Sequence, residues 1–401
     1  MNACACSGKT GAGAYDTSCS IHKLSHMQIQ VGKPVTGSNL IGREQELREL
    51  EQCIAMGQSV ALIAPRRYGK TSLLLESLRR SKQQNLFSFY LDLFSIPDLY
   101  DLAAEITKGV LSNRKLDFSI HQLKHQIADL MQNLQFRQEV EGSEFILGFG
   151  QASANAWDLL RSSLKLIETF SQKHKVQTVA VFDEFGDVGK LDGEKIVKLF
   201  RAELQLQAST ICLFSGSHES VMSNTFVSPT APFYRFARIF RLKPIDPGVF
   251  QKHLTSVFQE EGFEQPQPLA AQITRFTNGH PYYTQLLAQQ ALFHREQLGK
   301  ADRSFQDLLT LSLETEVNYC EKVWDEISAK HQEKQVVLEL AKGNSSLYAV
   351  MDSRKINISR TVKRLLNTGL LEKANGAYLF TDPLLRYWVR EKILKLPTPT
   401  P

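Results

Sequence analysis

Between residues 59 and 80, an apolar run is followed by a glycine-containing loop and an amphipathic helix. This succession restricts the possible folds more than any other feature of the sequence. Residues 59–63 read Ser-Val-Ala-Leu-Ile, which is typical of a strand buried on both faces. The loop at 64–71 reads Ala-Pro-Arg-Arg-Tyr-Gly-Lys-Thr, and leucines then recur with helical spacing over 73–78. A strand, a loop ending in Gly-Lys-Thr and a helix together predict a phosphate-binding loop in an α/β sheet.

The chemistry of phosphate binding gives a reason for each residue type in this loop. The turn aims consecutive backbone N–H groups and a helix N-terminus at phosphate oxygens. Gly69 allows close backbone approach, Lys70 would reach the β- and γ-phosphates, and the Thr71 hydroxyl would bind Mg²⁺. We therefore expect a nucleotide and Mg²⁺ to bind here. The expected nucleotide contacts are Ala64, Pro65, Arg66, Arg67, Tyr68, Gly69, Lys70, Thr71 and Ser72.

The same loop pattern occurs a second time, near the N-terminus. Residues 3–10 read Ala-Cys-Ala-Cys-Ser-Gly-Lys-Thr, but no strand-like run precedes them and Gly-Ala-Gly follows at 11–13. Without the strand and the helix, the backbone N–H groups have nothing to hold them in place. We interpret this copy as a chance match inside a disordered tail that covers residues 1–26.

A second apolar run ends in two acids, which is the arrangement that a phosphate-binding loop needs beside it. Residues 178–182 read Thr-Val-Ala-Val-Phe and are followed by Asp183 and Glu184. Ligands of open parallel sheets bind beyond the carboxyl ends of the strands. We expect Asp183 to hold Mg²⁺, largely through water, and Glu184 to act as the general base for the attacking water.

Further strands and helices alternate along the chain. A third apolar run at 210–214 is followed by Ser215 and Ser217, either of which is a candidate contact to the γ-phosphate or the attacking water; a small polar turn is the alternative. The alternation predicts a doubly wound α/β sheet. No Asn-Lys-x-Asp motif for reading guanine follows the acidic strand, which favours ATP. The remaining expected elements are strands at 86–93 and 237–242 and helices at 43–55, 97–111, 154–173 and 193–207.

The phosphate-binding loop, the acidic strand and several flanking segments resemble the STAND branch of the AAA+-related ATPases, and above all its archaeal-type ATPases. The resemblance covers most of residues 38–392. It implies a P-loop NTPase core with a parallel sheet at 27–245, a helical lid at 246–330 and a winged-helix domain at 331–395. The flanking segments are Leu-Ile-Gly-Arg-Glu-Gln-Glu at 40–46, Ser-Pro-Thr-Ala-Pro-Phe-Tyr-Arg-Phe-Ala-Arg at 228–238, Asn-Gly-His-Pro-Tyr-Tyr at 278–283 and Asp-Pro-Leu-Leu-Arg-Tyr-Trp at 382–388.

The resemblance implies roles for four residues. In the family, the arginine that matches Arg43 can contact the γ-phosphate; the alternative here is the acidic first turn of an amphipathic helix. Arg235 or Arg238 would sense phosphate and assist catalysis, although the glycine that usually precedes this arginine is missing, and a structural or partner salt bridge is the alternative. Pro281 would pack near adenine at the start of a lid helix.

The basic charge of the chain is concentrated in its C-terminal part. The formal net charge is +5, yet residues 331–396 carry 12 basic and 6 acidic residues, so the remainder has a net charge of −1. Helices expected at 333–342, 345–352 and 358–367 precede a hairpin with an Asn-Gly turn, which indicates a winged helix. Its candidate DNA contacts are Arg360, Lys363, Arg364 and Lys373; the alternative is a solvated basic face used for protein contact or autoinhibition.

These patterns predict a slow, Mg²⁺-dependent ATP hydrolase that acts as a conformational switch and controls the winged helix. One alternative is a nucleotide-gated binding module with negligible turnover. Another is an ATP-dependent DNA-binding protein that resembles origin-recognition initiators. A protein partner or a homo-oligomer is also expected. No apolar run reaches the roughly 18 residues of a membrane span, and no secretory signal is evident, so we expect a cytoplasmic protein without a membrane partner.

Overall fold

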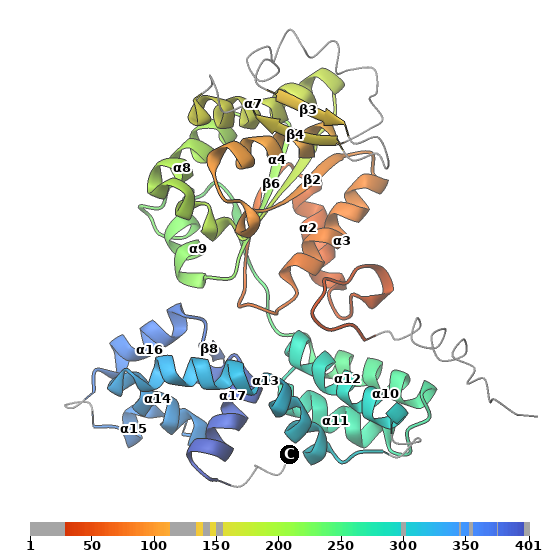
Figure 1. Ribbon diagram of the computed structural model, residues 1–401, viewed down its shortest axis with the longest axis vertical. Helices are drawn as coiled ribbons and strands as arrows, with labels where there is room; N and C mark the ends of the chain where they lie inside the picture. Colours follow the sequence, from red (N-terminus) through yellow and green to blue (C-terminus); the bar gives the residue numbers. More distant parts are fainter. Residues whose placement is uncertain are drawn as a thin grey trace, which may run out of the picture.

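The structure, a computed structural model, describes residues 29–112, 155–297, 302–344, 346–352, 356–374 and 376–396, together with the backbone of two short strands between residues 134 and 149. The expected tail at 1–26 and the second loop copy lie outside the described residues. Figure 1 shows an α/β part, formed by the N-terminal half of the chain, above a helical part formed by the C-terminal half.

A five-stranded parallel sheet forms the centre of the α/β part. The strand order β2-β5-β6-β1-β7 places the strand that leads into the phosphate-binding loop next to β6, which in turn borders the acidic strand β5. The carboxyl ends of all these strands therefore meet at one edge of the sheet. This confirms the expected parallel sheet, whose strands are β1 (Val60–Ile63), β2 (Phe87–Asp92), β5 (Thr178–Asp183), β6 (Thr210–Gly216) and β7 (Arg238–Arg241).

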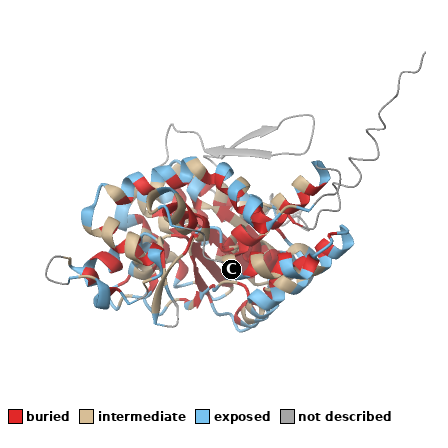
Figure 2. Cartoon of the chain, turned by 90° about the horizontal axis from the view of Figure 1, so that it is seen from below, coloured by how far each residue is buried: buried red, intermediate tan, exposed pale blue. Residues whose placement is uncertain are grey.

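Alternate residues of the strands pack against helices on opposite faces of the sheet. Val60 and Leu62 share a core with α2 and α3, whereas Ala61 and Ile63 share a core with α4, α7 and α8. Burial on both faces explains why β1, β5 and β6 are continuous apolar runs rather than alternating ones (Figure 2). The covering helices are α2 (Glu44–Ala55), α3 (Lys70–Gln83), α4 (Leu99–Leu111), α7 (Ala156–His174), α8 (Gly189–Leu204, with a kink at residues 192 and 193) and α9 (Glu219–Phe226).

An antiparallel strand pair that the sequence patterns do not predict lies outside the main sheet. Strands β3 (Leu134–Gln138) and β4 (Phe145–Phe149) pair with each other, and β4 lies against α4. Short 3-10 turns complete the α/β part; they are η1 (Gly37–Asn39), η2 (Leu93–Ser95) and η3 (Phe185–Asp187).

The C-terminal half consists of helices and one hairpin. The expected lid region contains α10 (Pro247–Glu260), α11 (Pro266–Thr277), α12 (Pro281–Gln297) and α13 (Phe305–Ser328). Three helices and an antiparallel hairpin follow in the order of a winged helix, although the expected helix at 345–352 is a single turn. They are α14 (His331–Lys342), α15 (Leu347–Val350), α16 (Ile358–Asn367), β8 (Leu371–Ala374) and β9 (Ala377–Phe380), and then α17 (Pro383–Trp388) and the π-helical turn η4 (Val389–Ile393).

One continuous apolar core runs through the lid region and the C-terminal helices. It joins residues of α10 to α13 with residues of α14, α16 and α17, and the rings of Trp324 and Trp388 lie 6.3 Å apart within it. The segments before and after residue 330 therefore share one apolar core. None of the described helices combines the length and the apolar composition that crossing a bilayer requires.

Candidate nucleotide-binding site

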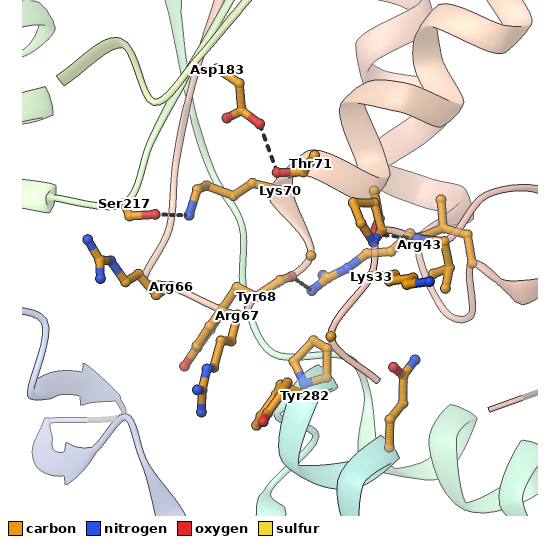
Figure 3. A pocket seen from close by; sticks show the side chains of 18 of the residues that line it. Lys33, Arg43, Arg66, Arg67, Tyr68, Lys70, Thr71, Asp183, Ser217 and Tyr282 are labelled. Atoms are coloured by element: carbon orange, nitrogen blue, oxygen red, sulfur yellow. Dashed lines mark hydrogen bonds between the residues drawn. The ribbon is translucent and has the colours of Figure 1, made fainter. Parts of the chain in front are cut away.

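A pocket of about 730 Å³ lies at the carboxyl edge of the sheet, where the α/β part meets the lid (Figure 3). The phosphate-binding loop and the ends of β2 and β5 form one side of it, and the first turn of α12 forms another. Because several elements converge on it from distant parts of the sequence, this pocket has the position that ligands take in open parallel sheets.

The backbone of the loop explains why glycine precedes the lysine. Gly69 has φ +83° and caps α3, which starts at Lys70. A Cβ at residue 69 would meet no atom within 4 Å, so the requirement for glycine comes from the left-handed backbone and not from crowding. The α3 N-terminus opens into the pocket, where its N–H groups favour an anion.

Lys70 lies in the pocket and is almost completely buried. Its Nζ donates to the carbonyls of Ala64 and Pro65, both at 3.1 Å, and to Ser217 Oγ at 2.7 Å, and it lies 4.0 Å from Glu184 Oε1. Burial lowers the pKa of the Lys70 ammonium below its usual value, and the nearby carboxylates oppose this shift. The ammonium group thus lies where the anionic oxygens of a polyphosphate chain could replace some of these acceptors.

Asp183 accepts hydrogen bonds from four groups. Thr71 Oγ1 and Tyr90 Oη donate to its Oδ2 at 2.7 and 2.8 Å, while Ser215 Oγ and the Glu184 N–H donate to its Oδ1, the latter at 2.9 Å. Together these bonds fix the carboxylate beside the Thr71 hydroxyl (Figure 3). Oxygen donors of this kind fit Mg²⁺, which takes few protein ligands and keeps its waters and phosphate oxygens. In the described part of the chain, no group of three or more His, Cys, Asp or Glu residues could hold a metal by itself.

Tyr90 is a site residue that the sequence patterns do not single out. It lies two residues before the end of β2, in register with Val181 of the acidic strand. Burial raises the pKa of its phenol, and Asp183 raises it further, so the hydroxyl stays a donor. A tyrosine near the carboxyl end of an expected strand was the available signal in the sequence.

Glu184 faces the pocket from a left-handed backbone with φ +48°. Its carboxylate accepts from the Ser217 N–H at 2.9 Å and from the Ser217 hydroxyl, and its side chain is 28% exposed, so water can reach it. The two candidate serines therefore differ in position. Ser217 lines the pocket, whereas Ser215 is completely buried and bonded to Asp183, and it does not line the pocket.

Arg43 lies behind the phosphate-binding loop. It is 1% exposed, and its guanidinium donates to the backbone carbonyl of Tyr68 at 3.1 Å, to that of Lys243 at 2.8 Å and to Glu46 at 2.7 Å (Figure 3). Burial lowers the pKa of this guanidinium, while Glu46 opposes the shift. Arg43 lines the pocket, but its bonds clamp the loop to the chain that follows β7.

Arg235 and Arg238 do not line the pocket. Arg238 is the first residue of β7 and pairs in register with Val60, the first residue of β1, so it lies at the amino edge of the sheet. It forms an ion pair with Glu49 at 3.8 Å, and the Arg235 guanidinium lies 5.2 Å from the Tyr234 ring. Because the strands are parallel, residues at the start of β7 are separated from the phosphate-binding edge by the length of the sheet.

The segment before α2 walls the pocket, and a buried acid holds it. The Val35 N–H donates to Ser72 Oγ at 3.0 Å, and the Gly37 N–H donates to Glu76 at 2.9 Å. Glu76 also accepts from Arg79 and Arg80, and these bonds lower its pKa to about 2. The sequence pattern does not indicate this anchor, because a single glutamate followed by arginines on a helix is also typical of a solvent-exposed face.

The lid closes the pocket at the start of α12. Pro281 is the first residue of that helix and lines the pocket together with Tyr282 and Gln285. The preceding Gly279 has φ +74°, and a Cβ there would lie 1.9 Å from the Ile245 carbonyl oxygen, so glycine alone permits this close approach. Pro281 therefore has a fixed position relative to the chain that follows β7.

The loop also reaches the C-terminal half of the chain through two of its own side chains. The Arg67 guanidinium lies 4.1 Å from the Tyr282 ring centre and donates to Glu316 on α13 at 3.2 Å. The Tyr68 hydroxyl donates to Glu372 on β8 at 3.0 Å. Neither contact follows from the loop motif, since the partners are 249 and 304 residues away in sequence.

The candidate DNA-binding residues lie on an exposed surface away from the pocket. Arg360, Lys363 and Arg364 are exposed on α16, whose opposite face is buried, and Arg364 forms an ion pair with Glu333 at 2.9 Å. Lys373 on β8 is exposed, and its Nζ lies 5.8 Å from the Tyr378 ring centre. The structure thus brings three of the four onto one helix face and leaves two of these without a carboxylate within salt-bridge distance among the described residues.

Comparisons with known proteins give one family match and several similar solved structures. Residues 40–287 match the family model described as an ATPase domain predominantly from Archaea. The fold is similar to that of a Walker-type ATPase of Pyrococcus abyssi, with a TM-score of 0.62 at 15% identity over 91% of this chain and 100% of that chain. The ORC2 protein of Aeropyrum pernix gives a TM-score of 0.47 at 12% identity over 90% of this chain and 97% of that chain. No curated protein matches the sequence.

The family match covers more than half of the chain and includes the loop, the acidic strand and the first turn of α12. The expectation of an archaeal-type P-loop ATPase is thereby confirmed. The loop and the strand ends that define this fold also line the pocket. This chain belongs to the family of ATPase domains found predominantly in Archaea.

Proposed function

We propose that this protein binds ATP with Mg²⁺ in the pocket, hydrolyses it slowly and uses the cycle to control its C-terminal domain. The convergence of Lys70, the Thr71–Asp183 pair and Glu184 at one edge of the sheet carries the proposal. Lys70 and the α3 N-terminus would bind the β- and γ-phosphates, and Pro281 and its neighbours on α12 would pack near adenine.

Each group has a separate task in hydrolysis. Thr71 and Asp183 would hold Mg²⁺, which when bound neutralises charge on the β- and γ-phosphates. Glu184 would accept the proton of the attacking water, and Ser217 orients its carboxylate through two hydrogen bonds. Ser215 and Tyr90 would orient Asp183 without contacting the nucleotide.

Phosphate release by the purified protein tests this proposal. We expect steady-state turnover with ATP and Mg²⁺ that stops when EDTA removes the metal, measured together with the nucleotide content of the protein as purified. Tightly bound ADP without phosphate release would instead favour a nucleotide-gated binding module. Protein that neither contains nor binds a nucleotide would contradict both.

The contacts of Arg67 and Tyr68 support the proposed switch. A nucleotide that repositions the loop would also act on Glu316 and Glu372, which belong to the continuous C-terminal part of the structure. Hydrolysis would then shift the equilibrium between a docked state, in which the C-terminal part contacts the loop through Glu316 and Glu372, and a released state without these contacts. Binding of a protein partner or of a second copy to the released domain remains a prediction from the sequence.

The variant Tyr68→Phe tests this coupling, because it removes the hydroxyl and keeps the ring that lies 4.7 Å from His280. Glu372 is half-buried, and loss of its donor costs about 1–3 kcal/mol, so we expect amides of residues 371–380 to exchange about 5- to 150-fold faster. Hydrogen exchange by mass spectrometry measures this. Tyr378→Phe on β9 is the matched control. Unchanged exchange, or faster exchange throughout the chain, would contradict a specific contact.

We also propose the basic face of α16 as a DNA contact. The positive charge of the chain is concentrated in this region, and Arg360 and Lys363 are exposed on the helix that follows α14 and α15. Exposed guanidinium and ammonium groups on one helix face are the groups that contact DNA phosphates.

Reversing the three basic residues to glutamate tests DNA contact in a gel shift over a range of salt concentrations. Each phosphate contact that is lost should lower the salt slope by about 1, and binding at low salt should disappear. If the reversed protein binds as well as the wild type, α16 is not the contact. The test variant combines Arg360→Glu, Lys363→Glu and Arg364→Glu, and the control combines Lys165→Glu, Lys195→Glu and Lys198→Glu in the α/β part.

A further inference from the structure

Two adjacent arginines of the phosphate-binding loop have different surroundings. Arg67 has φ +67°, and its guanidinium is held between the Tyr282 ring and Glu316. Arg66 is exposed, lines the pocket and, within the described part of the chain, makes no hydrogen bond or ion pair. Figure 3 shows the Arg66 side chain on the side of the loop where Ser217 lies, whereas Arg67 points toward Tyr282.

The position of Arg66 places its charge near the reacting end of a bound nucleotide. Lys70 bonds to Ser217, and Ser217 bonds to Glu184, so these three residues mark the place where the γ-phosphate and the attacking water would meet. Arg66 and Lys70 line the same pocket, and Figure 3 shows both side chains on the side of Ser217; after burial, the charge of Arg66 also lowers the pKa of the Lys70 ammonium. An unpaired guanidinium beside the Lys70 ammonium favours an anion in this part of the pocket.

The other arginines of the site are already engaged or distant. Arg43 lines the pocket but is bonded to the Tyr68 and Lys243 carbonyls behind the loop, and Arg67 is bonded to Glu316. Arg235 does not line the pocket. Of the described arginines that line it, Arg66 is thus the one whose guanidinium has no protein partner.

We propose that Arg66 is a catalytic residue that binds the γ-phosphate from within the same chain. This inference rests on the proposed ATP hydrolysis. Water oxygen forms the new bond to the γ-phosphorus, the bond to the β–γ bridging oxygen breaks, and its electron pair leaves with ADP. Glu184 takes the water proton. The Arg66 guanidinium donates to the γ-phosphate oxygens and stabilises the charge that builds up as the bond breaks.

The variant Arg66→Ala tests this role, because the loss of the guanidinium should affect the binding of ATP but not the binding of ADP. A guanidinium on the γ-phosphate is worth about 10³-fold in turnover, and we expect a loss of that order. ATP should bind more weakly than to the wild type, whereas ADP, which lacks the γ-phosphate, should bind within about threefold of the wild type. Retained ADP binding also shows that the variant folds. Added guanidinium ion should restore part of the turnover.

Three comparisons make the result decisive. Arg48→Ala, which removes an exposed arginine of α2 outside the pocket, should match the wild type. Arg67→Ala removes the same charge from the same loop and should keep the wild-type ratio of ATP to ADP affinity. Wild-type turnover per chain should not depend on protein concentration, because the arginine is supplied in cis; a rise with concentration would point to a second copy and overturn the assignment.

Two further results would overturn the role of Arg66 while leaving the proposed function intact. One is Arg66→Ala turnover within about threefold of the wild type, and the other is an equal loss of ATP and ADP affinity. If the wild type itself shows no turnover, the proposed hydrolysis fails, and the catalytic role of Arg66 fails with it. A selective loss of ATP affinity in Arg66→Ala would then show γ-phosphate binding alone.

Discussion

Replacing Lys70 by alanine is expected to weaken ATP binding at least about 100-fold. A hydrogen bond to a charged group contributes about 1.5–3 kcal/mol, and Lys70 would make such bonds to two phosphate groups, while about 1.4 kcal/mol corresponds to a factor of ten. Its ammonium group already lies in the pocket and donates to the loop carbonyls and Ser217, and a charged phosphate oxygen can replace one of these neutral acceptors. Isothermal titration calorimetry with ATP measures the effect.

Lys70→Arg and thermal unfolding serve as the controls for this result. Arginine keeps the charge but differs in shape, so it should recover only part of the binding. The alanine variant should remain folded, because the buried ammonium is desolvated and its removal leaves only acceptors that water in the pocket can satisfy. ATP binding by Lys70→Ala within tenfold of the wild type would contradict the assignment of the loop as the phosphate site.

Glu184→Gln is expected to retain ATP binding and to lower turnover by about 10²–10⁴-fold. Glutamine has the same shape, and its amide can keep both contacts to Ser217, accepting from the N–H and donating to the hydroxyl. It cannot take a proton from water. Single-turnover phosphate release and ATP affinity, measured on the same preparation, separate the chemical step from binding.

The control for this variant is Glu219→Gln, in which the replaced carboxylate pairs with Arg241 and does not line the pocket. It should hydrolyse ATP as the wild type does. Normal hydrolysis by Glu184→Gln would show that Glu184 is not the base. The hydrogen bonds between Ser217 and Glu184 would then have no role in catalysis. Another group of the pocket would have to orient the attacking water.

Local sequence patterns were sufficient to predict the parts of the site that lie on one strand–loop–helix unit. The positions of β1 and α3 follow from an apolar run, a glycine that must adopt a left-handed backbone, and leucines with helical spacing. The acidic end of β5 follows in the same way. The parallel sheet also follows, since alternating strands and helices permit few arrangements.

Positions across the sheet needed the strand order. Ser217 faces the pocket and Ser215 does not, because the chain leaves β6 between them and turns toward Lys70. Arg238 lies at the amino edge because β7 runs parallel to β1 and starts beside it. For Arg238 the strand order was not required, because any residue at the start of a strand in a parallel sheet lies at the amino edge.

The sequence by itself determined the phosphate-binding loop, the acidic strand and the concentration of positive charge near the C-terminus, because these depend on spacing within short segments. Only the tertiary structure decided what each arginine near the loop does. Arg43 and Arg67 are bonded to groups 200 and 249 residues away, whereas Arg66 faces the pocket. A side chain's role depends on which partners the folded chain brings within hydrogen-bond distance, and neighbouring residues of one loop can point to opposite sides.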